Sequence, residues 1–427
     1  MKKILKWPVT FILTLEAKLL LWRKKPKIIA VVGSVGKTST KDAIYAVLKD
    51  TVKVRRSSKS YNSDIGVPLT VLGLKSGWDK PLSWLKNILS GLTKALFANH
   101  YPEVLILELG VDRPGDMKKL TAWIKPDIVV LTRLPEVPVH VEFFATPEDV
   151  IAEKLLILEA LKVDGKLVFN RDDERVREAA LETRQKSISY SRYSFSDFTA
   201  AGDTILYDGG VPLGTEFNLT HNNQAVLTII NGTLGVQHAY VAAAAAAVGS
   251  LFDISLEVVS ERLKLHRPPP GRMRIIDGLK NTLIIDDTYN SSPVAARRAL
   301  QTLKEITGFK RKIVVFGDVM ELGEYSDDEH QKLGEMVAGI ADGLFTIGER
   351  SHQVAARALE CGLSEKMIWQ YDNSRQAGKD LELFLNEEDI VLVKGSQSIR
   401  AEEVVKEVMA EPEKAEELLV RQEQVWQ

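Results

Sequence analysis

A glycine-rich turn between a short β-branched run and a helix-forming stretch limits how this chain can fold. Residues Lys27–Val32 have the composition of a buried strand, and Lys41–Leu48 have that of a helix. The turn between them reads Gly-Ser-Val-Gly-Lys-Thr over residues 33–38. Glycines let backbone N–H groups approach an anion, and the start of the helix adds the positive end of its dipole. The pattern therefore predicts a phosphate-binding loop (P-loop) that opens an α/β domain.

Two side chains of the same turn suit a nucleotide. Lys37 supplies a full positive charge for phosphate, and the hydroxyl of Thr38 is a ligand that Mg²⁺ accepts. The spacing is shorter than the common G-x-x-x-x-G-K-[ST] form, so the motif alone also fits a glycine turn with a solvated lysine. The strand before the turn and the helix after it favour phosphate binding.

Composition sets wider limits on the class of protein. A chain of 427 residues with 45% hydrophobic and 27% charged residues has enough material for two or three domains. A net charge of −2 provides no field that would attract nucleic acid. The single cysteine, Cys361, excludes a disulfide framework and a multi-cysteine zinc site. It also favours a reducing, cytoplasmic compartment.

The N-terminus is unusual for a cytoplasmic enzyme. Residues 7–22 are mostly apolar with tryptophan at both ends, and basic residues flank them. The run is shorter than the roughly 20 apolar residues of a membrane span, and it contains Glu16 and Lys18. One interpretation is an amphipathic helix over residues 1–26 in the plane of the inner membrane surface; the other is a helix packed on the chain's own domain. A second apolar stretch at 78–97 belongs either to the core or to the same membrane-facing patch.

The rest of the chain alternates between strand and helix patterns. From 27 to 266 this alternation predicts a central domain with a mostly parallel sheet and a small antiparallel excursion at 198–233. The three prolines within 267–272 predict a linker between domains. The alternation then restarts, which predicts a Rossmann-like α/β C-terminal domain over 273–410. We expect the charged tail at 411–427 to form a solvated helix.

Three polar residues outside the loop are candidates for work on a bound nucleotide. Glu108 ends a predicted strand just before a glycine, which makes it the first candidate for a Mg²⁺ ligand. His140 lies in a proline-rich loop after the next strand, and Lys154 lies on the helix that follows. A lone histidine or lysine is more often structural or solvated, so spacing alone leaves both roles open.

Six segments taken together resemble the motifs of the Mur ligase family over about residues 27–410. In order, they are Gly33–Ser39, Asn62–Leu69, Glu108–Gly110, Asp286–Pro293, Gly317–Gly323 with His330, and Lys394–Ser396. The resemblance implies ATP-dependent amide bond formation, in which a carboxylate becomes an acyl phosphate that an amine then attacks. It further implies that D-alanyl-D-alanine or a similar amine is added to a peptidoglycan precursor peptide, a step of cell wall biogenesis on which cell shape and division depend.

The resemblance also implies roles for individual residues. ATP would be held by Gly33, Ser34, Gly36, Lys37, Thr38, Ser39, Arg272 and Asp287. Two Mg²⁺ ions would be held by Thr38, Glu108, His140 and Lys154, the last as a carbamate formed with carbon dioxide. The amine would be bound by Tyr289, Asn290, Ser292, Pro293, Lys394 and Ser396. Lys37, Glu108, His140 and Lys154 would be the catalytic set, and Asp318, Glu321 and His330 would also contribute to the site.

Three departures from the family pattern affect these expectations. Only about 26 residues precede the first strand, so we expect the family's N-terminal uridine-diphosphate-binding domain to be absent. The acceptor would then be held differently, for example as a lipid-linked precursor. His238-Ala-Tyr-Val-Ala242 lacks the asparagine that usually meets adenine, which leaves the base preference open. The loop 133–140 is longer than usual, with Arg133 in place of asparagine.

Two other functions stay open from sequence alone. One is a related ligase with another substrate, such as a glutamate-polymerising or amidating member. A single cysteine cannot build the zinc ribbon of the amidating type. The other is a P-loop switch or scaffold that binds nucleotide without ligating, which would have no need for Glu108, Lys154 or the motifs of the second domain.

Overall fold

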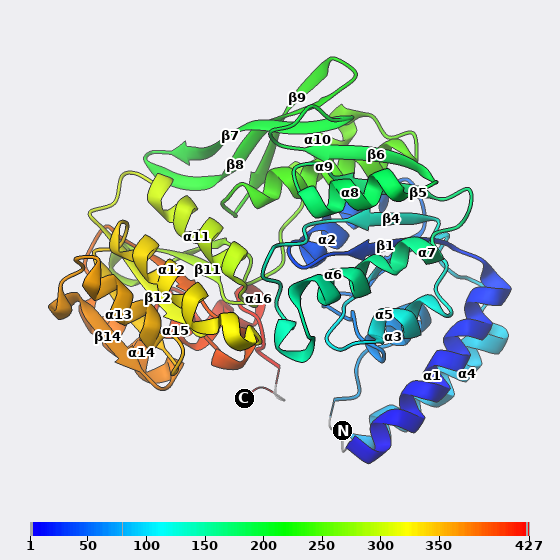
Figure 1. Cartoon of the computed structure of the whole chain (residues 1–427), viewed down its shortest axis with the longest axis horizontal. Coiled ribbons are helices and arrows are strands. Elements are labelled where there is room, and N and C mark those ends of the chain that lie inside the picture. Colours follow the sequence, from blue (N-terminus) through cyan, green and yellow to red (C-terminus); the bar gives the residue numbers. More distant parts are fainter. Residues whose placement is uncertain (1–2, 79, 424–425, 427) are drawn as a thin grey trace.

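The computed structural model describes residues 3–78, 80–423 and 426, and these form two lobes around two sheets (Figure 1). The central lobe contains a nine-stranded sheet in the order β2-β3-β1-β4-β5-β6-β7-β8-β9. Its strands are β1 Lys27–Val32, β2 Val54–Arg56, β3 Val104–Glu108, β4 Ile128–Leu131, β5 Lys166–Asn170, β6 Lys186–Ser191, β7 Phe198–Asp208, β8 Val211–His221 and β9 Gln224–Asn231.

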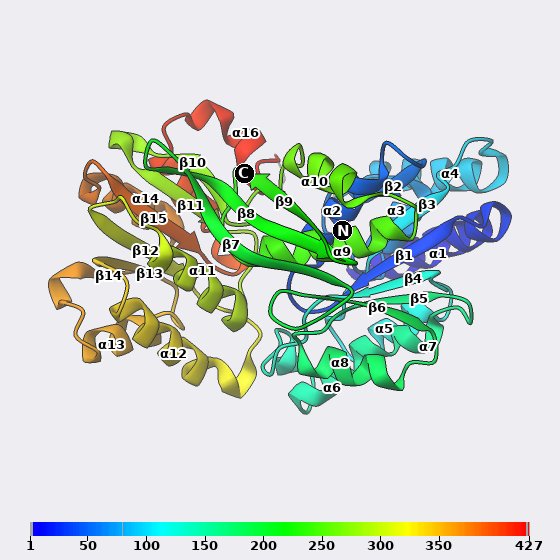
Figure 2. The ribbon, with the colours of Figure 1, turned by 90° about the horizontal axis from the view of Figure 1, so that it is seen from above.

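The antiparallel excursion predicted at 198–233 is confirmed, and it extends the main sheet. Strands β1 to β7 pair in parallel, and only the β7–β8 and β8–β9 pairs are antiparallel. The β7–β8 hairpin reaches the other lobe (Figure 2), where the backbone N–H of Thr307 donates to the Tyr207 hydroxyl at 3.2 Å. This strand pair therefore braces the two lobes against each other.

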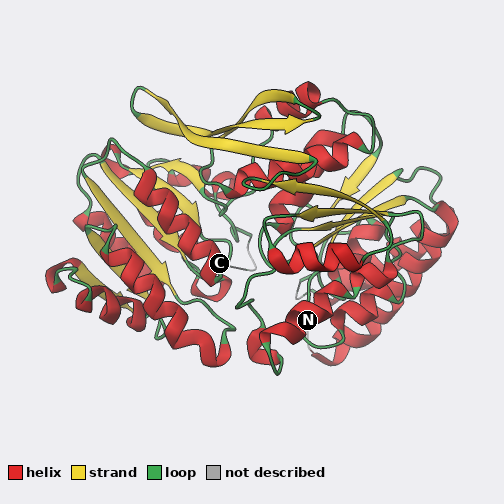
Figure 3. Cartoon of the chain, turned by 45° about the horizontal axis from the view of Figure 1, so that its top comes forward, coloured by secondary structure: helices red, strands yellow, loops and turns green. Residues whose placement is uncertain are grey.

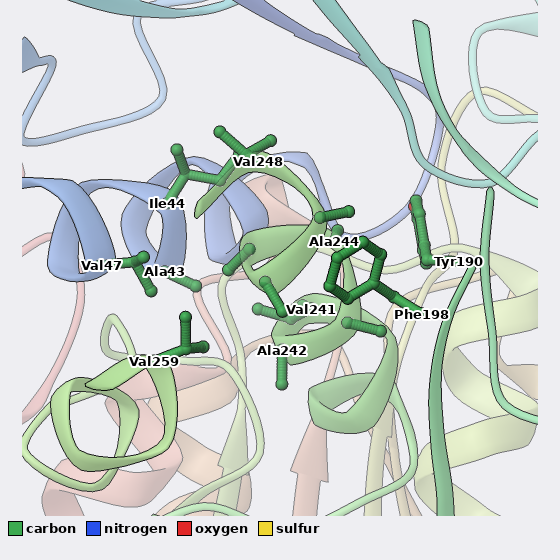
Figure 4. Packing of buried hydrophobic residues seen from close by; sticks show 14 of the residues in the cluster. Ala43, Ile44, Val47, Tyr190, Phe198, Val241, Ala242, Ala244, Val248 and Val259 are labelled. Carbon is green, nitrogen blue, oxygen red and sulfur yellow. The ribbon is translucent and has the colours of Figure 1, made fainter. Parts of the chain in front are cut away.

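Helices cover both faces of the central sheet (Figure 3). One face is covered by α2 Lys37–Leu48, α9 Gln237–Ser250 and α10 Leu256–Lys264. The alanines of α9 are buried and let it pack closely on α2 (Figure 4). The other face carries α1 Lys3–Lys24, α3 Gly66–Leu72, α4 Pro81–Phe97, α5 Asp116–Thr121, α6 Pro147–Leu155, α7 Ile157–Ala160 and α8 Glu174–Glu182. The helix that the sequence predicts around Lys154 is divided between α6 and α7.

The C-terminal lobe is the second α/β unit that the sequence predicts. Its six-stranded sheet has the order β10-β11-β15-β12-β13-β14 and is parallel except for the β10–β11 pair. The strands are β10 Arg274–Asp277, β11 Leu283–Asp287, β12 Arg311–Gly317, β13 Gly343–Ile347, β14 Ile368–Tyr371 and β15 Asp389–Lys394. The helices are α11 Pro293–Glu305, α12 Ser326–Ala338, α13 His352–Glu360, α14 Ser374–Phe384, α15 Glu402–Val408 and α16 Ala415–Leu418. Short 3₁₀ turns lie at Val141–Phe143, Leu279–Asn281, Gly323–Tyr325, Glu365–Met367, Gln397–Ile399 and Pro412–Lys414.

The N-terminal helix α1 lies beside α4 at one edge of the central lobe (Figure 1). One face of α1 enters the core through Leu13, Ala17 and Leu20, as one interpretation of the sequence expects. The opposite face is exposed and apolar, and Trp7 and Trp22 are both more than 70% exposed. No helix among the described residues has the length and apolarity needed to cross a membrane. Residues 1, 2 and 79 of the two predicted apolar stretches lie outside the described residues.

The prediction of a solvated helix over 411–427 was wrong. Within the described part, the segment forms only a short turn and the single-turn helix α16. Leu419 and Arg421 beyond α16 are buried, because Leu419 joins the core of the lobe and Arg421 has a buried carboxylate partner, Glu402. Residues 424, 425 and 427 lie outside the described residues.

Candidate active site

The predicted phosphate loop connects the carboxyl end of β1 to the start of α2. Gly33 and Gly36 have φ values of +147° and +86°, which favour glycine. A Cβ on Gly33 would also lie 2.0 Å from Oγ1 of Thr132, so a side chain does not fit there. Gly36 precedes the first residue of α2 and makes no side-chain cap, so the first N–H groups of the helix are free to meet an anion.

Lys37 folds back over this loop. Its Nζ donates to the carbonyl oxygen of Gly33 at 2.8 Å. Burial lowers the pKa of Lys37, Glu108 opposes this shift, and Arg272 of the linker adds to it. A partly buried cation beside free helix N–H groups favours a multiply charged anion such as a polyphosphate.

Glu108 ends β3 next to this loop and has the chemistry of a Mg²⁺ ligand. Its Oε1 accepts hydrogen bonds from Thr38 Oγ1 at 3.2 Å, Ser60 Oγ at 2.5 Å and Asn62 Nδ2 at 3.3 Å. Its Oε2 is buried without a hydrogen-bond partner among the described residues, although Lys41 Nζ lies 3.7 Å away. A free carboxylate oxygen beside a threonine hydroxyl fits a hard divalent cation.

A cation here would need further oxygen ligands. The described residues contain no cluster of three or more His, Cys, Asp or Glu side chains that could hold a metal. Mg²⁺ commonly binds through one or two protein ligands, with substrate phosphates and waters completing its shell. The donor set at Thr38 and Glu108 therefore fits a metal that arrives with a nucleotide.

Lys154 lies on α6 and points to the same loop. It is 2% exposed, and its Nζ donates to Ser34 Oγ at 2.9 Å. Burial, and to a smaller extent the charge of Lys37, lower the pKa of Lys154 to about 7, while Asp112 acts in the opposite direction. An amine with this pKa is partly neutral near pH 7, so it has a free electron pair for reaction.

His140 lies where the two lobes meet. Its Nδ1 is 2.6 Å from Oε2 of Glu321 in the C-terminal lobe, and its Nε2 is 3.5 Å from Oδ1 of Asp112. This pairing lowers the pKa of Glu321. Asp112 also raises the pKa of Lys154, so this carboxylate acts on both His140 and Lys154. No sequence pattern singles out Asp112, because its place beside His140 depends on how the loop after β3 folds.

The C-terminal lobe presents a loop at the end of β11. Asp287 Oδ2 accepts from Lys394 Nζ at 2.6 Å, and Asp287 Oδ1 accepts from the Met273 N–H at 3.2 Å. Lys394 also donates to the carbonyl oxygen of Asn290 at 3.1 Å. The guanidinium of Arg272 lies 4.2 Å from the centre of the Tyr289 ring. These contacts join the linker, β11 and β15 at one end of the sheet.

Other predicted site residues support local structure. Ser292 caps α11 by accepting from the Ala295 N–H at 3.3 Å, and Pro293 occupies the first turn of that helix. Ser396 accepts from the Met320 N–H at 2.9 Å. Asp318 and His330 likewise accept from backbone N–H groups, of Ser351 and Val319 respectively. Ser39 is buried in α2.

A cavity of about 1000 Å³ lies beside the Tyr289 loop and is lined by residues of both lobes. Ser60 and Asn62 line it and also hydrogen-bond to Glu108, so the cavity adjoins the candidate metal ligand. Both lobes contribute polar groups, and Lys6 of α1 lies at its edge. Further lining residues include Asp112, Arg113, His140, Asn290, Glu321 and Ser396.

Two family models match this chain in succession. Residues 31–249 match the Mur ligase middle domain, and residues 271–397 match the Mur ligase glutamate ligase domain. The chain belongs to the Mur ligase family. As a Mur ligase it is an ATP-dependent enzyme that forms amide bonds, which answers the alternative of a switch or scaffold without ligase activity.

Curated relatives of this Mur ligase match it over most of its length. The UDP-N-acetylmuramoyl-tripeptide--D-alanyl-D-alanine ligase of Bacillus subtilis is 26% identical over 399 residues, covering 93% of this chain and 79% of the relative. The Escherichia coli enzyme of the same name is 27% identical over 388 residues, covering 89% of this chain and 76% of the relative.

Solved structures show the same fold. The Thermotoga maritima MurF ligase in complex with ADP has a TM-score of 0.75 at 24% identity, covering 95% of this chain and 84% of the other. A MurF structure from Acinetobacter baumannii has a TM-score of 0.74 at 23% identity, covering 92% and 79%. The α/β architecture predicted from the sequence is therefore that of the Mur ligases.

One departure from the family pattern has a structural counterpart in this Mur ligase. His238 is buried, its Nε2 lies 2.8 Å from Thr233 Oγ1, and burial lowers its pKa to about 3. The imidazole is therefore neutral, and its Nε2 is engaged by Thr233 of the same lobe. Thr233 in turn donates to the carbonyl oxygen of Arg272 at 2.9 Å, so this pair anchors the linker.

Proposed function

We propose that this Mur ligase joins D-alanyl-D-alanine, or a similar amine, to the carboxylate of a peptidoglycan precursor peptide. The curated relatives named above carry this activity in their names. The observation that supports it most directly is the double role of Ser60 and Asn62, which bind Glu108 and line the cavity shared with Tyr289 and Asn290. A carboxylate activated at the phosphate end would thus face an amine held at the other end.

The chemistry follows from this arrangement. An acceptor carboxylate oxygen bonds to the γ-phosphorus while the bond to the bridging oxygen breaks, and ADP leaves. The amine nitrogen then attacks the acyl carbon, and phosphate departs as the amide forms. Lys37 and the loop N–H groups neutralise charge on the transferred phosphoryl group. Thr38 and Glu108 would hold Mg²⁺, which supplies further charge neutralisation when bound.

Lys154 would contribute as a carbamate. Its pKa of about 7 supports this role, because only a neutral amine can attack carbon dioxide. The ammonium group first releases one proton; the neutral nitrogen then bonds to the carbon of CO₂ and releases a second proton, so that a cation has become an anion. That anion and His140 would hold a second Mg²⁺. Asp112 lies near both residues and would favour a cation between them.

The direct test supplies the purified enzyme with ATP, a precursor tripeptide on a uridine diphosphate or lipid carrier, and D-alanyl-D-alanine. Phosphate release should require both acceptor and dipeptide, and mass spectrometry should find the pentapeptide product. Product formed with glutamate but not with the dipeptide would instead indicate a ligase for another amine. Rapid phosphate release without any amine would contradict the coupled mechanism.

We also propose that α1 and α4 bind the surface of an anionic membrane. Their outer faces expose Trp7, Phe11, Leu15, Trp22, Leu82, Leu85, Leu89 and Phe97. Glu16, the only acidic residue within the two helices, is buried, whereas several lysines flank the apolar residues. Exposed tryptophan with basic neighbours and no exposed acid suits anionic headgroups.

This surface also has a connection to the cavity. Lys6 lines the cavity and pairs with Asp64 at 3.3 Å, and the exposed ring of Trp7 follows directly. A membrane-bound enzyme would therefore hold the mouth of its cavity near the headgroups. Such a position supports a lipid-linked precursor as the acceptor.

Sedimentation with vesicles tests the membrane proposal. The enzyme should bind phosphatidylglycerol vesicles more than phosphatidylcholine vesicles. Replacing Trp7 and Trp22 with serine should lower vesicle binding about tenfold or more, since each aromatic side chain that enters the membrane contributes about 2 kcal/mol to binding. Leu383→Ser removes an equally exposed apolar side chain from the C-terminal lobe and should have no effect. Equal sedimentation of the tryptophan variant and the wild type would contradict the proposal.

A further inference from the structure

The C-terminal segment runs from its own lobe towards the central lobe along the substrate cleft. Residues 419–423 and 426, which we name the strap, line a second cavity of about 680 Å³ with Thr38, Ser60 and Tyr289. The base of the strap is fixed, because Leu419 is buried and Arg274 donates to the carbonyl oxygens of Glu417 and Leu418 just before it. The strap thus lies beside residues of both lobes.

Arg421 is the buried charge of this strap. Its Nε and Nη2 donate to the two oxygens of the Glu402 carboxylate at 2.9 and 2.6 Å. The same guanidinium donates to the carbonyl oxygens of Thr288 at 2.6 Å and Tyr289 at 3.0 Å. A planar guanidinium with several fixed donors can make all these bonds at once, whereas an ammonium group cannot.

The two carbonyls belong to the loop after β11. Tyr289 and Asn290 of this loop line the main cavity, where the proposed function places the amine. Lys394 fixes the loop from one side through Asp287 and Asn290. Arg421 holds the carbonyl oxygens of Thr288 and Tyr289, to which Lys394 makes no hydrogen bond among the described residues. Each cation therefore sets a different part of the loop.

The far end of the strap contacts the central lobe. Glu423 forms an ion pair with Lys59, and the Trp426 ring packs edge-on against Trp78 with 5.8 Å between ring centres. Lys59 directly precedes Ser60, which hydrogen-bonds to Glu108. The Glu423–Lys59 contact between the lobes thus lies two residues along the strap from Arg421.

We propose that Arg421 is a positioning residue for the amine, and that the strap couples closure of the two lobes to the order of the Thr288–Asn290 backbone. This inference rests on the proposed function only for the identity of the amine. The strap holds Arg421 against Glu402 and the two carbonyls, and the loop then presents Tyr289 and Asn290 to the cavity.

The test compares Arg421→Ala, Arg421→Lys and the control Arg375→Ala. Arg375 of α14 pairs at 3.4 Å with Glu403, which follows Glu402 on α15. Its side chain is largely exposed, and among the described residues it makes no hydrogen bond to the loop. Ligation kinetics are measured for each substrate, and hydrogen exchange is measured for the amides of residues 288–291. Exchange needs no substrate, so it separates this proposal from the proposed function.

Arg421→Ala should raise the KM for the dipeptide about tenfold, since hydrogen bonds from a charged donor are lost, while the KM for ATP changes less than about twofold. Loop amides should exchange faster, Arg421→Lys should recover part of both effects, and Arg375→Ala should match the wild type. If Arg421→Ala fails to fold, Arg421→Lys carries the same test. Two results would overturn the role of Arg421. One is hydrogen exchange of the loop amides at the wild-type rate in Arg421→Ala, and the other is a lower kcat with every KM unchanged. A wild type that ligates no dipeptide would overturn the proposed function alone.

Discussion

The phosphate end and the amine end of the cleft are built in opposite ways. The phosphate loop is one contiguous stretch between β1 and α2, and its glycines and Lys37 are fixed by local geometry. The Tyr289 loop is held by the Gly271 carbonyl of the linker, by β15 and by the strap. Changes at the first end should therefore impair phosphoryl transfer, whereas changes at the second should mainly affect binding of the amine.

The largest effect should come from the phosphate end. Lys37→Ala removes the cation over the loop, and we expect the ligation rate to fall about a thousandfold, as when a donor to a transition-state anion is lost. The KM for the amine should change little, which initial-rate kinetics would reveal. Lys162→Ala is the control, because this lysine is half-exposed and pairs only with Asp127 among the described residues. A large rise in the amine KM of the Lys37 variant would break the distinction between the two ends.

Lys154 provides the second test at the same end. We expect Lys154→Ala to lower the rate about a hundredfold through the loss of one electrostatic contact to the metal site. Lys154→Glu should recover part of the activity without carbon dioxide, because it supplies a permanent carboxylate. Mass spectrometry of the wild type under bicarbonate would detect the carbamate directly. An alanine variant with full activity in the absence of carbon dioxide would rule out this role.

The same contrast explains what could be read from the sequence. The phosphate loop was predictable because each requirement lies within a few residues of the next. Strand β14 and helix α14 were not predicted, since β14 is short and only half-buried. The strap was misread as solvated because its charges are evident in the sequence, whereas the partner of Arg421 is not. The two interpretations of α1 need not compete, because one face enters the core and the other is exposed.

A smaller effect should come from the contact between the lobes. Glu321→Gln removes the charge that pairs with His140, so closure should weaken and the KM of the amine should rise about threefold, as for a partly exposed ion pair. High salt should reduce the difference from the wild type, because it screens such a pair. Glu324→Gln lies in the same turn and is exposed, so it serves as the control. A variant that altered only the KM for ATP would show that Glu321 acts at the phosphate end of the cleft and not at the amine end.

The smallest effect should come from Glu16, which lies between α1 and α4 and serves neither end. A Cβ on Gly91 would lie 2.0 Å from Glu16 Oε2, so the carboxyl group packs directly on the backbone of α4. Burial raises the pKa of Glu16 from its ordinary 4.5 to about 7. Between these values the folded state binds a proton that the unfolded state has released, so folding stability falls as pH rises through this window and then levels off.

Glu16→Gln should abolish this pH dependence, raise Tm at pH 8 by about 2 °C and leave both KM values unchanged. Thermal unfolding at pH 5 and pH 8 would measure the change in Tm, and Glu148→Gln, which alters an exposed carboxylate, is the control. The glutamine keeps the shape of the side chain while removing the charge that burial disfavours, so any gain should be confined to pH values at which Glu16 is ionised. Wild-type and variant Tm values that differ equally at both pH values would show that packing, not charge, sets the cost at this position.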